Sequence, residues 1–364
     1  MRRISARART GWLGRLRRDP VLVSPALLAV LLAVGEVLTP PEKPVYRLLP
    51  AVPALAAVLW PVVPTLLLGL VCLLGAGVYA MVSADHTAAF TVGSIGAVTL
   101  AAAYASHLRL QREGTITEVR TVADATQKVL LRPIPSHVGP LEIGSLYLTA
   151  TPHARVGGDF YGLADTSDVI RLIIGDVRGK GLPALAAASA VLGSFREAAY
   201  DAVDLAQIAS RLETALSRDA AAAFAHGDPS ELFATAVLAE IPRDAAHATI
   251  LSCGHPPPLL GRRGSVHVLD SHDPAPPLNL GGLLTPTFHI CRFAFGAGDQ
   301  LLLYTDGVTE ARGADGTFFP LTVWARDNMD NPPRQVLTCL HDALLEHSGD
   351  NLSDDVAAVA IRRI

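Results

Sequence analysis

Short acidic motifs in the second half of the chain stand beside apolar runs that are typical of β-strands. The motifs are Gly157-Gly158-Asp159, Gly175-Asp176-Val177, Thr305-Asp306-Gly307 and Ser353-Asp354-Asp355. Strand ends that are distant in a sequence can converge at one edge of a sandwich, so these carboxylates can form one cluster. A site made of carboxylates, backbone carbonyls and water suits Mg²⁺ or Mn²⁺ and offers little to Zn²⁺ or Cu²⁺. The pattern therefore indicates a site for hard divalent cations.

Each feature also has a simpler explanation when it is taken alone. An Asp beside a Gly is usually a turn residue, but the joint order and spacing of the motifs favour metal ligands. The four cysteines are far apart and have no CxxC spacing, which indicates reduced core residues rather than a zinc site or a disulfide framework. His255 precedes three prolines and is either a proton donor to a leaving group or part of a rigid connection, and the prolines favour the connection.

The charge distribution divides the chain into unlike regions. Residues 1–19 contain seven arginines and one acid, residues 21–106 are nearly uncharged, and the remainder has the mixed composition of a globular domain. A membrane-spanning helix needs about 20 mostly apolar residues. The apolar block predicts four spans if its middle segment divides near Trp60-Pro61, or three because Leu48 to Trp60 is short. A cleaved signal peptide over residues 1–38 is the less favoured alternative.

The flanking arginines predict the orientation in the membrane, because arginine-rich flanks stay on the cytoplasmic side. The N-terminal arginines, together with Arg109 and Arg112 after the last span, place both ends of the apolar region in the cytoplasm. An even number of spans satisfies both ends. The sequence therefore predicts a multi-pass protein of the cell membrane, in contact with the lipid bilayer, whose globular domain faces the cytoplasm. We expect no nucleic-acid partner.

A helical linker is predicted between the apolar region and the globular domain. Ile116, Val119, Ala123, Thr126 and Leu130 are spaced three and four apart and form one stripe along a helix. This stripe either pairs with its copy in a homodimer or packs on its own domain. Two prolines among residues 132–135 end the helix.

The chain is accordingly divided into a basic cytoplasmic N terminus (1–19), a transmembrane region (20–107), a linker helix (108–135) and a globular domain (136–364). The β-rich runs expected in this domain are 142–150, 168–175, 232–240, 247–252, 266–269, 287–293, 300–305 and 356–362. The expected helices are Pro183 to Tyr200, a helix with the N-cap Asp204 and a face running to Leu216, and Pro333 to His347. Segregated strands and helices indicate the α+β class rather than a doubly wound parallel sheet.

Six motifs together carry a resemblance to a known family. They are Val156-Gly-Gly-Asp-Phe-Tyr161, Ile174-Gly-Asp-Val-Arg-Gly-Lys-Gly-Leu-Pro183, Phe233-Ala-Thr235, Cys253-Gly-His-Pro-Pro-Pro-Leu259, Leu303-Tyr-Thr-Asp-Gly-Val-Thr-Glu-Ala311 and Asp354-Asp-Val356. Each is weak alone, but all six stand in the family's order. The chain from roughly residue 120 onward resembles the bacterial stage II sporulation protein E family, a branch of the PPM-type, metal-dependent serine/threonine phosphatases. The membrane region is not covered.

The resemblance implies an α-β-β-α sandwich with two Mn²⁺ or Mg²⁺ ions at one edge. The apolar block predicts that a bundle of about four transmembrane helices precedes this sandwich. It implies that Asp176 bridges the two cations, that the Val177 carbonyl is the adjacent ligand, and that Asp176 and Asp306 are essential for catalysis. The other matching ligands are Asp306 and Asp354 for the first metal and Asp159 for the second, with Asp355 as a less favoured alternative to Asp354. A pair of metals lowers the pKa of a bridging water, which then attacks phosphorus.

The resemblance also implies a phosphorylated protein substrate, in this family usually an anti-anti-sigma factor whose dephosphorylation frees a sigma factor. Gly162 stands where the family often has a second acid, which puts the holding of the second metal in doubt. The alternative of another class is a non-catalytic membrane scaffold, although retention of the acidic positions argues against it. A nucleotide cyclase, suggested by Gly-Gly-Asp, is disfavoured because Phe160 and Tyr161 follow the Asp and no P-loop motif is present.

Overall fold

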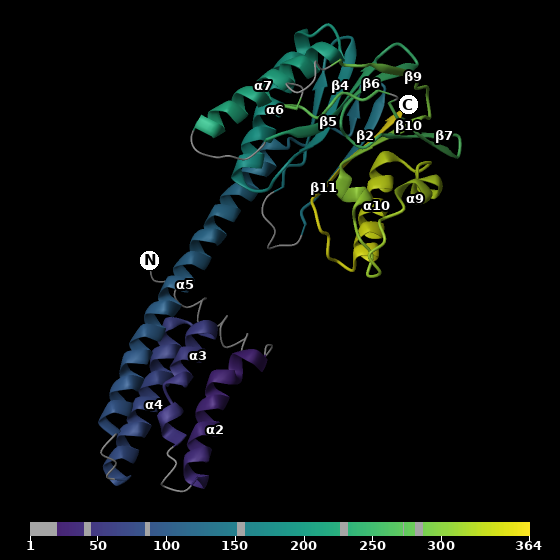
Figure 1. Cartoon of the computed structure of the whole chain (residues 1–364). Coiled ribbons are helices and arrows are strands. Elements are labelled where there is room, and N and C mark those ends of the chain that lie inside the picture. Colours follow the sequence, from purple (N-terminus) through teal and green to yellow (C-terminus); the bar gives the residue numbers. More distant parts are fainter. Residues whose placement is uncertain are drawn as a thin grey trace. The chain divides into compact units, whose positions relative to one another are not determined.

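The structure is a computed structural model that describes residues 20–39, 45–83, 88–150, 157–225, 232–271, 273–280 and 287–364. Its internal contacts divide the chain into two units, Met1–Val119 and Arg120–Ile364, whose elements are labelled in Figure 1. The seven N-terminal arginines lie outside the described residues, as do the side chains of Ile116, Val119 and Ala123 in the linker stripe. Each unit has its own architecture.

The first unit consists of helices. They are η1 (Pro20–Val23), α2 (Ser24–Leu38), η2 (Val45–Leu48), α3 (Ala51–Leu59), α4 (Val62–Ser83) and the N-terminal part of α5 (Ala88–Leu130). Among the described residues, three stretches are long and apolar enough to cross a membrane, namely Val21–Leu38, Val62–Val82 and Ala89–Glu113. Val45–Leu59 is apolar but shorter, so four spans remain a prediction. The helix break expected near Trp60-Pro61 is observed between α3 and α4.

Two hydrogen bonds place the short stretch Val45–Leu59 beside α2. Trp60 Nε1 donates to the Leu22 carbonyl at the start of that helical segment (2.7 Å), and the Tyr46 N–H donates to the Glu36 carboxylate near its end (2.7 Å). The short stretch therefore runs antiparallel to α2 over most of its length. Val45–Leu59 thus lies alongside α2 within this unit.

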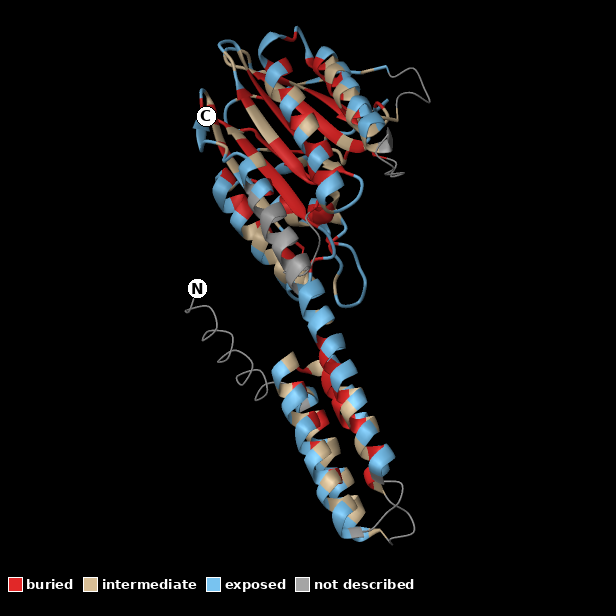
Figure 2. Ribbon diagram, turned by 90° about the vertical axis from the view of Figure 1, so that its left-hand side faces the viewer, coloured by how far each residue is buried: buried red, intermediate tan, exposed pale blue. Residues whose placement is uncertain are grey.

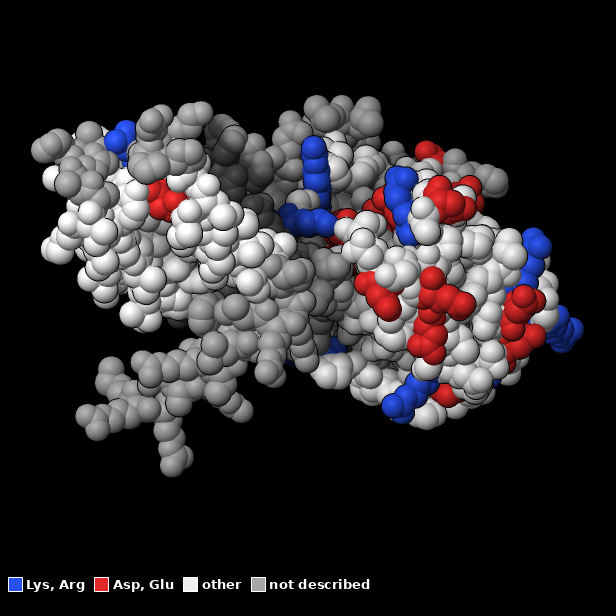
Figure 3. Space-filling view, turned by 90° about the horizontal axis from the view of Figure 1, so that it is seen from below, with Lys and Arg blue, Asp and Glu red and all other residues white. Residues whose placement is uncertain are grey.

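The outward surface of the first unit is apolar. Val30, Leu67 and Leu74 are each more than half exposed, and exposed residues follow the helices of this unit in Figure 2. In Figure 3 one part of the surface is nearly free of Lys, Arg, Asp and Glu, whereas the other carries many of them. A soluble protein rarely exposes so large an apolar surface, so this unit is suited to a lipid environment.

The second unit contains two antiparallel sheets. The six-stranded sheet has the order β1 (His137–Val138), β2 (Leu141–Leu148), β11 (Val356–Arg363), β10 (Gln300–Tyr304), β7 (Leu259–Arg262), β8 (Ser265–Val268). The five-stranded sheet has the order β3 (Phe160–Asp165), β4 (Val169–Val177), β5 (Ala234–Pro242), β6 (His247–Cys253), β9 (Cys291–Ala294). Strands distant in the sequence, such as β2 and β11, thereby become neighbours.

Helices cover the outer face of each sheet. On the five-stranded sheet, α6 (Leu182–Asp201) lies against β3 and β4, and α7 (Leu205–Ala225) against β5 and β6. On the six-stranded sheet, α10 (Pro333–Ser348) lies against β2 and β11, and α9 (Leu321–Asn328) against β7 and β8. The four layers form the α-β-β-α sandwich that the sequence predicted, so the expected α+β class is confirmed.

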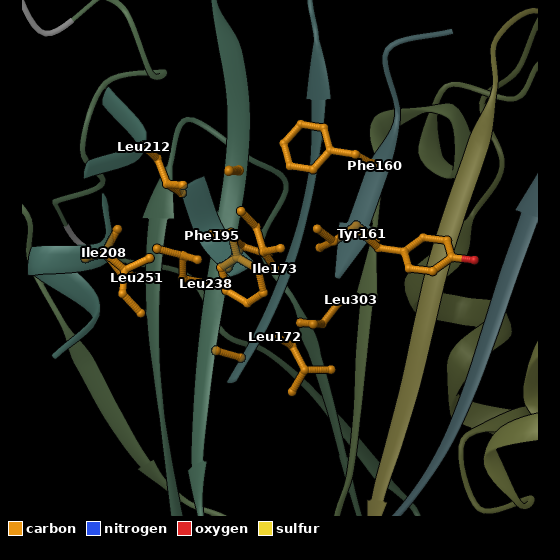
Figure 4. Packing of buried hydrophobic residues seen from close by; sticks show 14 of the residues in the cluster. Phe160, Tyr161, Leu172, Ile173, Phe195, Ile208, Leu212, Leu238, Leu251 and Leu303 are labelled. Carbon is orange, nitrogen blue, oxygen red and sulfur yellow. The ribbon is translucent and has the colours of Figure 1, made fainter. Parts of the chain in front are cut away.

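The largest core cluster fills the space between the sheets and under α6 and α7. Figure 4 shows Ile173, Leu238 and Leu251, from three neighbouring strands, with Phe195 of α6. A second cluster lies between the six-stranded sheet and helices α9 and α10. Because both faces of each sheet are covered, central strands are apolar throughout, and all five residues of β10 are buried. This packing fixes the strand ends that carry the acidic motifs.

Candidate metal centre

Asp176 lies next to the C-terminal end of β4, opposite Thr235 of β5 in the register of the sheet. The backbone of Gly158 lies directly against this strand end. A Cβ at Gly158 would be 2.1 Å from the Val177 carbonyl oxygen and 2.7 Å from Asp176 Oδ1. Only glycine allows this approach. The motif that contains Asp159 is thereby brought to Asp176 and to the Val177 carbonyl.

Asp159 is buried at the start of β3, with 5% of its surface exposed. Its Oδ2 accepts a hydrogen bond from Thr305 Oγ1 (2.7 Å). Thr305 Oγ1 accepts the Ala357 N–H (2.9 Å), and the Thr305 N–H donates to the Ala357 carbonyl (3.0 Å). Thr305 therefore connects the two sheets at the edge where the motifs lie. No role was predicted for the Thr305 side chain from the sequence, although its place directly before Asp306 is a signal that it lies at the site.

Asp306 and Asp354 reach the same edge from the six-stranded sheet. Asp306 is the first residue of the short helix α8 (Asp306–Thr309), and Asp354 precedes β11. Asp354, half exposed, forms an ion pair with Lys180 Nζ at 2.7 Å. An exposed ion pair of this kind contributes about 1 kcal/mol or less, so Lys180 only weakly opposes a rotation of the Asp354 side chain toward a cation.

In the described part of the chain, no group of three Asp, Glu, His or Cys side chains is placed to hold one ion directly.

Asp355 has a different environment from Asp354. It is 4% exposed, and hydrogen-bond donors already bind both of its oxygens. Oδ1 accepts the Ala150 N–H (2.8 Å), while Oδ2 accepts the Tyr147 hydroxyl (2.8 Å) and the Gly157 N–H (3.0 Å). A carboxylate held in this way supports the surrounding backbone. The geometry therefore favours Asp354 over Asp355 as the open ligand.

Burial and mutual repulsion raise the pKa of the clustered carboxyls. The pKa of Asp176 is raised to about 7, mainly by burial and then by the charge of Asp306. The pKa of Asp159 is raised well above its ordinary value by burial and then by Asp176, and that of Asp306 by burial and then by Glu310. Buried like charges are stable only with a proton or a cation nearby. An all-oxygen donor set fits Mg²⁺ or Mn²⁺, so these residues fit the expected metals.

His255 connects the two sheets beside the carboxylates. Its Nε2 is 3.0 Å from the Tyr304 carbonyl and its Nδ1 is 2.9 Å from Thr235 Oγ1. A carbonyl can only accept, so Nε2 carries the proton and Nδ1 accepts from the Thr235 hydroxyl. Burial lowers the pKa of His255 to about 3, which keeps the ring neutral. Since its N–H is already bound to the backbone, the structure favours a rigid connection over a proton donor.

The fold and the site together define a class of enzyme. The PP2C domain of SiaA from Pseudomonas aeruginosa aligns with 69% of this chain and 98% of its own length, at a TM-score of 0.57 and 18% identity. The PP2C phosphatase domain of SpoIIE from Bacillus subtilis, solved with a fragment of its regulatory domain, aligns with 61% of this chain and 62% of its own length, at a TM-score of 0.51 and 18% identity. These likenesses show a PP2C-type fold.

The family follows from the sequence of the same unit. Residues 166–364 match the model of the stage II sporulation protein E family, and the chain belongs to this family. It is similar to phosphoserine phosphatase RsbU from Bacillus subtilis, with 24% identity over 267 residues that make up 72% of this chain and 75% of the relative. The chain is therefore a protein serine/threonine phosphatase.

Proposed function

We propose that this phosphatase hydrolyses phosphoserine or phosphothreonine with two divalent cations, Mn²⁺ or Mg²⁺. The observation that carries the proposal is the group formed by the buried Asp159 and the partly buried Asp176 and Asp306, whose negative charges act on one another beside the Val177 carbonyl. A bound cation removes this repulsion. Two cations held close together lower the pKa of a shared water and offset charge on the phosphoryl oxygens.

The protein's own contribution is to hold ligand oxygens in place. The proposed ligands are Asp159, Asp176, the Val177 carbonyl, Asp306 and Asp354, with Asp355 as a support. Thr305 orients Asp159 by a hydrogen bond of 2.7 Å. Because Gly158 has no Cβ, its backbone can lie close to the Val177 carbonyl oxygen and to Asp176 Oδ1. These fixed oxygens would hold the cations in place, and the cations would offset the negative charge of the transition state without reorganisation.

For the substrate we propose a phosphorylated anti-anti-sigma factor. The support is the family, together with the similarity to RsbU, which is named a phosphoserine phosphatase. Regulation of a sigma factor would follow from this dephosphorylation.

We also propose that residues 20–107 anchor the enzyme in the cell membrane and leave the phosphatase domain in the cytoplasm. The support for the anchor is the set of three apolar stretches long enough to span a membrane. The support for the orientation is Arg109 and Arg112 near the end of the third stretch, with the shorter Val45–Leu59 as the further pass that an even number of spans requires. A reporter that is active only in the cytoplasm should work when fused after Leu131. Activity there of a reporter restricted to the cell exterior would contradict the orientation.

A homodimer through the linker helix (108–135) is the remaining proposal about partners. Leu130, the last residue of the stripe, packs against Leu185 of α6, and Arg196 donates to the Leu130 carbonyl at 2.5 Å. The C-terminal end of the stripe thus packs on its own domain. Pairing between two copies of the chain would therefore use the positions of the stripe that precede Leu130. Val119→Asp should make the full-length protein monomeric in detergent by light scattering, whereas a dimer that persists would contradict pairing through the stripe.

A metal titration of the full-length protein in lipid nanodiscs tests the function. With a phosphoserine-containing anti-anti-sigma protein as substrate, phosphate release should stop in excess chelator and return with Mn²⁺ or Mg²⁺. Asp306→Asn should lower the rate by about a hundredfold or more, while the exposed control Asp342→Asn on α10 should keep it. Hydrolysis in excess chelator would refute the metal mechanism. Binding of Mn²⁺ without hydrolysis of any phosphoprotein would support the scaffold alternative.

A further inference from the structure

A chain of partly buried hydrogen bonds connects the end of helix α5 to Asp355. Gln127 of α5 donates from Nε2 to the Tyr147 hydroxyl oxygen. The Tyr147 hydroxyl donates in turn to Asp355 Oδ2 at 2.8 Å. Each group thus donates to the next, an arrangement in which hydrogen bonds polarise and strengthen one another.

The burial of this chain indicates a specific role. Gln127 and Asp355 are each only 4% exposed. An apolar residue at position 127 would pack without the cost of burying an amide, so the Gln is explained by its bond to Tyr147. Burial, followed by the charge of Asp355, raises the pKa of Tyr147. The hydroxyl therefore remains protonated and acts as a donor to the carboxylate.

The strand register explains why Tyr147 reaches Asp355. Tyr147 of β2 is paired with Ala357 of β11, two residues after Asp355. Side chains two residues apart on a strand lie on the same face, so Tyr147 and Asp355 are diagonal neighbours. Ala357 is also hydrogen-bonded to Thr305, which orients Asp159. Tyr147 thus lies on one side of β11 and Thr305 on the other.

Asp355 connects two parts of the candidate metal centre. Through Oδ2 it holds the Gly157 N–H, at the start of the motif that carries Asp159. Through its own N–H it binds Asp354 Oδ1 at 3.0 Å. A shift or rotation of the Asp355 carboxylate would therefore move the segment that carries Asp159, and a shift of the Asp355 backbone would move the Asp354 side chain.

We propose that Gln127 and Tyr147 are positioning residues of the phosphatase, which set the metal affinity of the centre by fixing Asp355. This inference rests on the proposed metal centre. It gives the end of α5 a direct connection to the ligands, separate from its contact with α6 through Leu130 and Leu185. Residues that support metal ligands from outside change metal affinity by about tenfold to a hundredfold when they are replaced.

The test measures Mn²⁺ binding to the full-length protein in nanodiscs, by the electron paramagnetic resonance signal of free Mn²⁺. Tyr147→Phe should raise the Mn²⁺ dissociation constant by about tenfold or more. Gln127→Leu should raise it by about threefold, because a neutral hydrogen bond is weaker than one to a carboxylate. The Mn²⁺ concentration for half-maximal activity should rise in parallel, and activity should return at saturating Mn²⁺.

A matched control and a double variant separate positioning from general damage. Tyr161→Phe removes another buried hydroxyl, which is bonded to Ser145, and should leave Mn²⁺ affinity unchanged. In the Tyr147→Phe background, Gln127→Leu should have no further effect, because its influence passes through the Tyr147 hydroxyl. Independent effects of the two substitutions would overturn the proposed connection.

Failure of this inference can be distinguished from failure of the proposed function. If the wild type binds no Mn²⁺, the metal centre itself is wrong. If the wild type binds Mn²⁺ and Asp176→Asn does not, while Tyr147→Phe and Gln127→Leu bind it with wild-type affinity, only the positioning role is refuted. Should Tyr147→Phe fail to fold, Gln127→Leu decides alone, and unchanged Mn²⁺ affinity in that variant overturns the proposal.

Discussion

The two ends of strand β4 carry buried charge in opposite ways. Near its start, Arg171 is 5% exposed and binds Glu240 of β5 from Nε and Nη2, each at 2.7 Å. Its Nη1 also donates to the Ala199 carbonyl at 2.8 Å. Near the other end, Asp176 faces the negative charges of Asp306 and Asp159. One strand therefore carries a matched ion pair at one end and gathered carboxylates at the other.

The difference separates structure from function. A buried charge is stable when a partner and hydrogen bonds replace its water, as they do for Arg171. Carboxylates gathered beside one another are instead stable only with a proton or a cation nearby, and perturbed groups of this kind cluster at functional sites. We therefore interpret the Arg171 end as a structural tie between β4, β5 and α6, and the Asp176 end as the site of chemistry.

Replacement of Asp176 should have the largest effect. Asp176→Asn removes a charged ligand from the carboxylate end, so phosphatase activity should fall by about a hundredfold or more. The thermal midpoint of the metal-free protein should stay or rise, because repulsion with Asp306 and Asp159 is relieved. Phosphate release and circular dichroism measure the two outcomes. Near-normal hydrolysis with Mn²⁺ would mean that this end of β4 is not the site.

Replacement of Arg171 should affect stability instead of chemistry. Arg171→Met leaves the partly buried Glu240 without its partner, and the free energy of unfolding of the phosphatase unit should fall by about 3 kcal/mol. The double variant Arg171→Met with Glu240→Leu should recover most of this loss. Denaturation followed by near-ultraviolet circular dichroism provides the measurement, with the exposed Arg211→Met as a control. If Arg171→Met and Arg211→Met were equally stable, the structural role assigned to the Arg171 end of β4 would be wrong.

The pH dependence of the free energy of unfolding should distinguish the Asp176 end of β4 from the Arg171 end, with a smaller effect than the substitutions above. The pKa of Asp176 is raised in the folded protein from 3.8 to about 7, so between these values the folded state binds more protons than the unfolded state. The stability of the metal-free protein should therefore decrease as pH rises from about 4 to about 7. Asp176→Asn, or saturation with Mn²⁺, should reduce this decrease. Thermal midpoints that rise over the same range would contradict the assignment.

His255 should give the smallest effect on chemistry. Burial lowers its pKa to about 3, so the ring does not titrate in the neutral range. His255→Gln should lower stability by about 1 kcal/mol through weaker contacts with Thr235 and Tyr304. The shape of the pH–rate profile at saturating Mn²⁺ should not change. Loss of the alkaline limb of that profile in His255→Gln would restore the proton-donor role.

Local patterns in the sequence predicted much of the fold. Asp204 was expected to cap a helix, and its Oδ1 accepts the Gln207 N–H at 2.9 Å in the first turn of α7. The long apolar runs correspond to strands, and the expected helix from Pro333 corresponds to α10. The elements of the second unit that were missed are β1, β3, β7, α8 and α9 (His137–Val138, Phe160–Asp165, Leu259–Arg262, Asp306–Thr309 and Leu321–Asn328). They are short or lack clear periodicity, so packing against neighbours decides their conformation.

The sequence by itself determined which residues could bind hard cations, because carboxylates beside glycines at strand ends are visible as motifs. Only the tertiary structure decided how they are arranged. The bond from Thr305 to Asp159 joins residues 146 positions apart, and the bond from Tyr147 to Asp355 joins residues 208 positions apart. Contacts of this kind have no local signature, since strand pairing and sheet packing create them. For the same physical reason, the burial that distinguishes Asp355 from Asp354 becomes visible only when β2 and β11 are side by side.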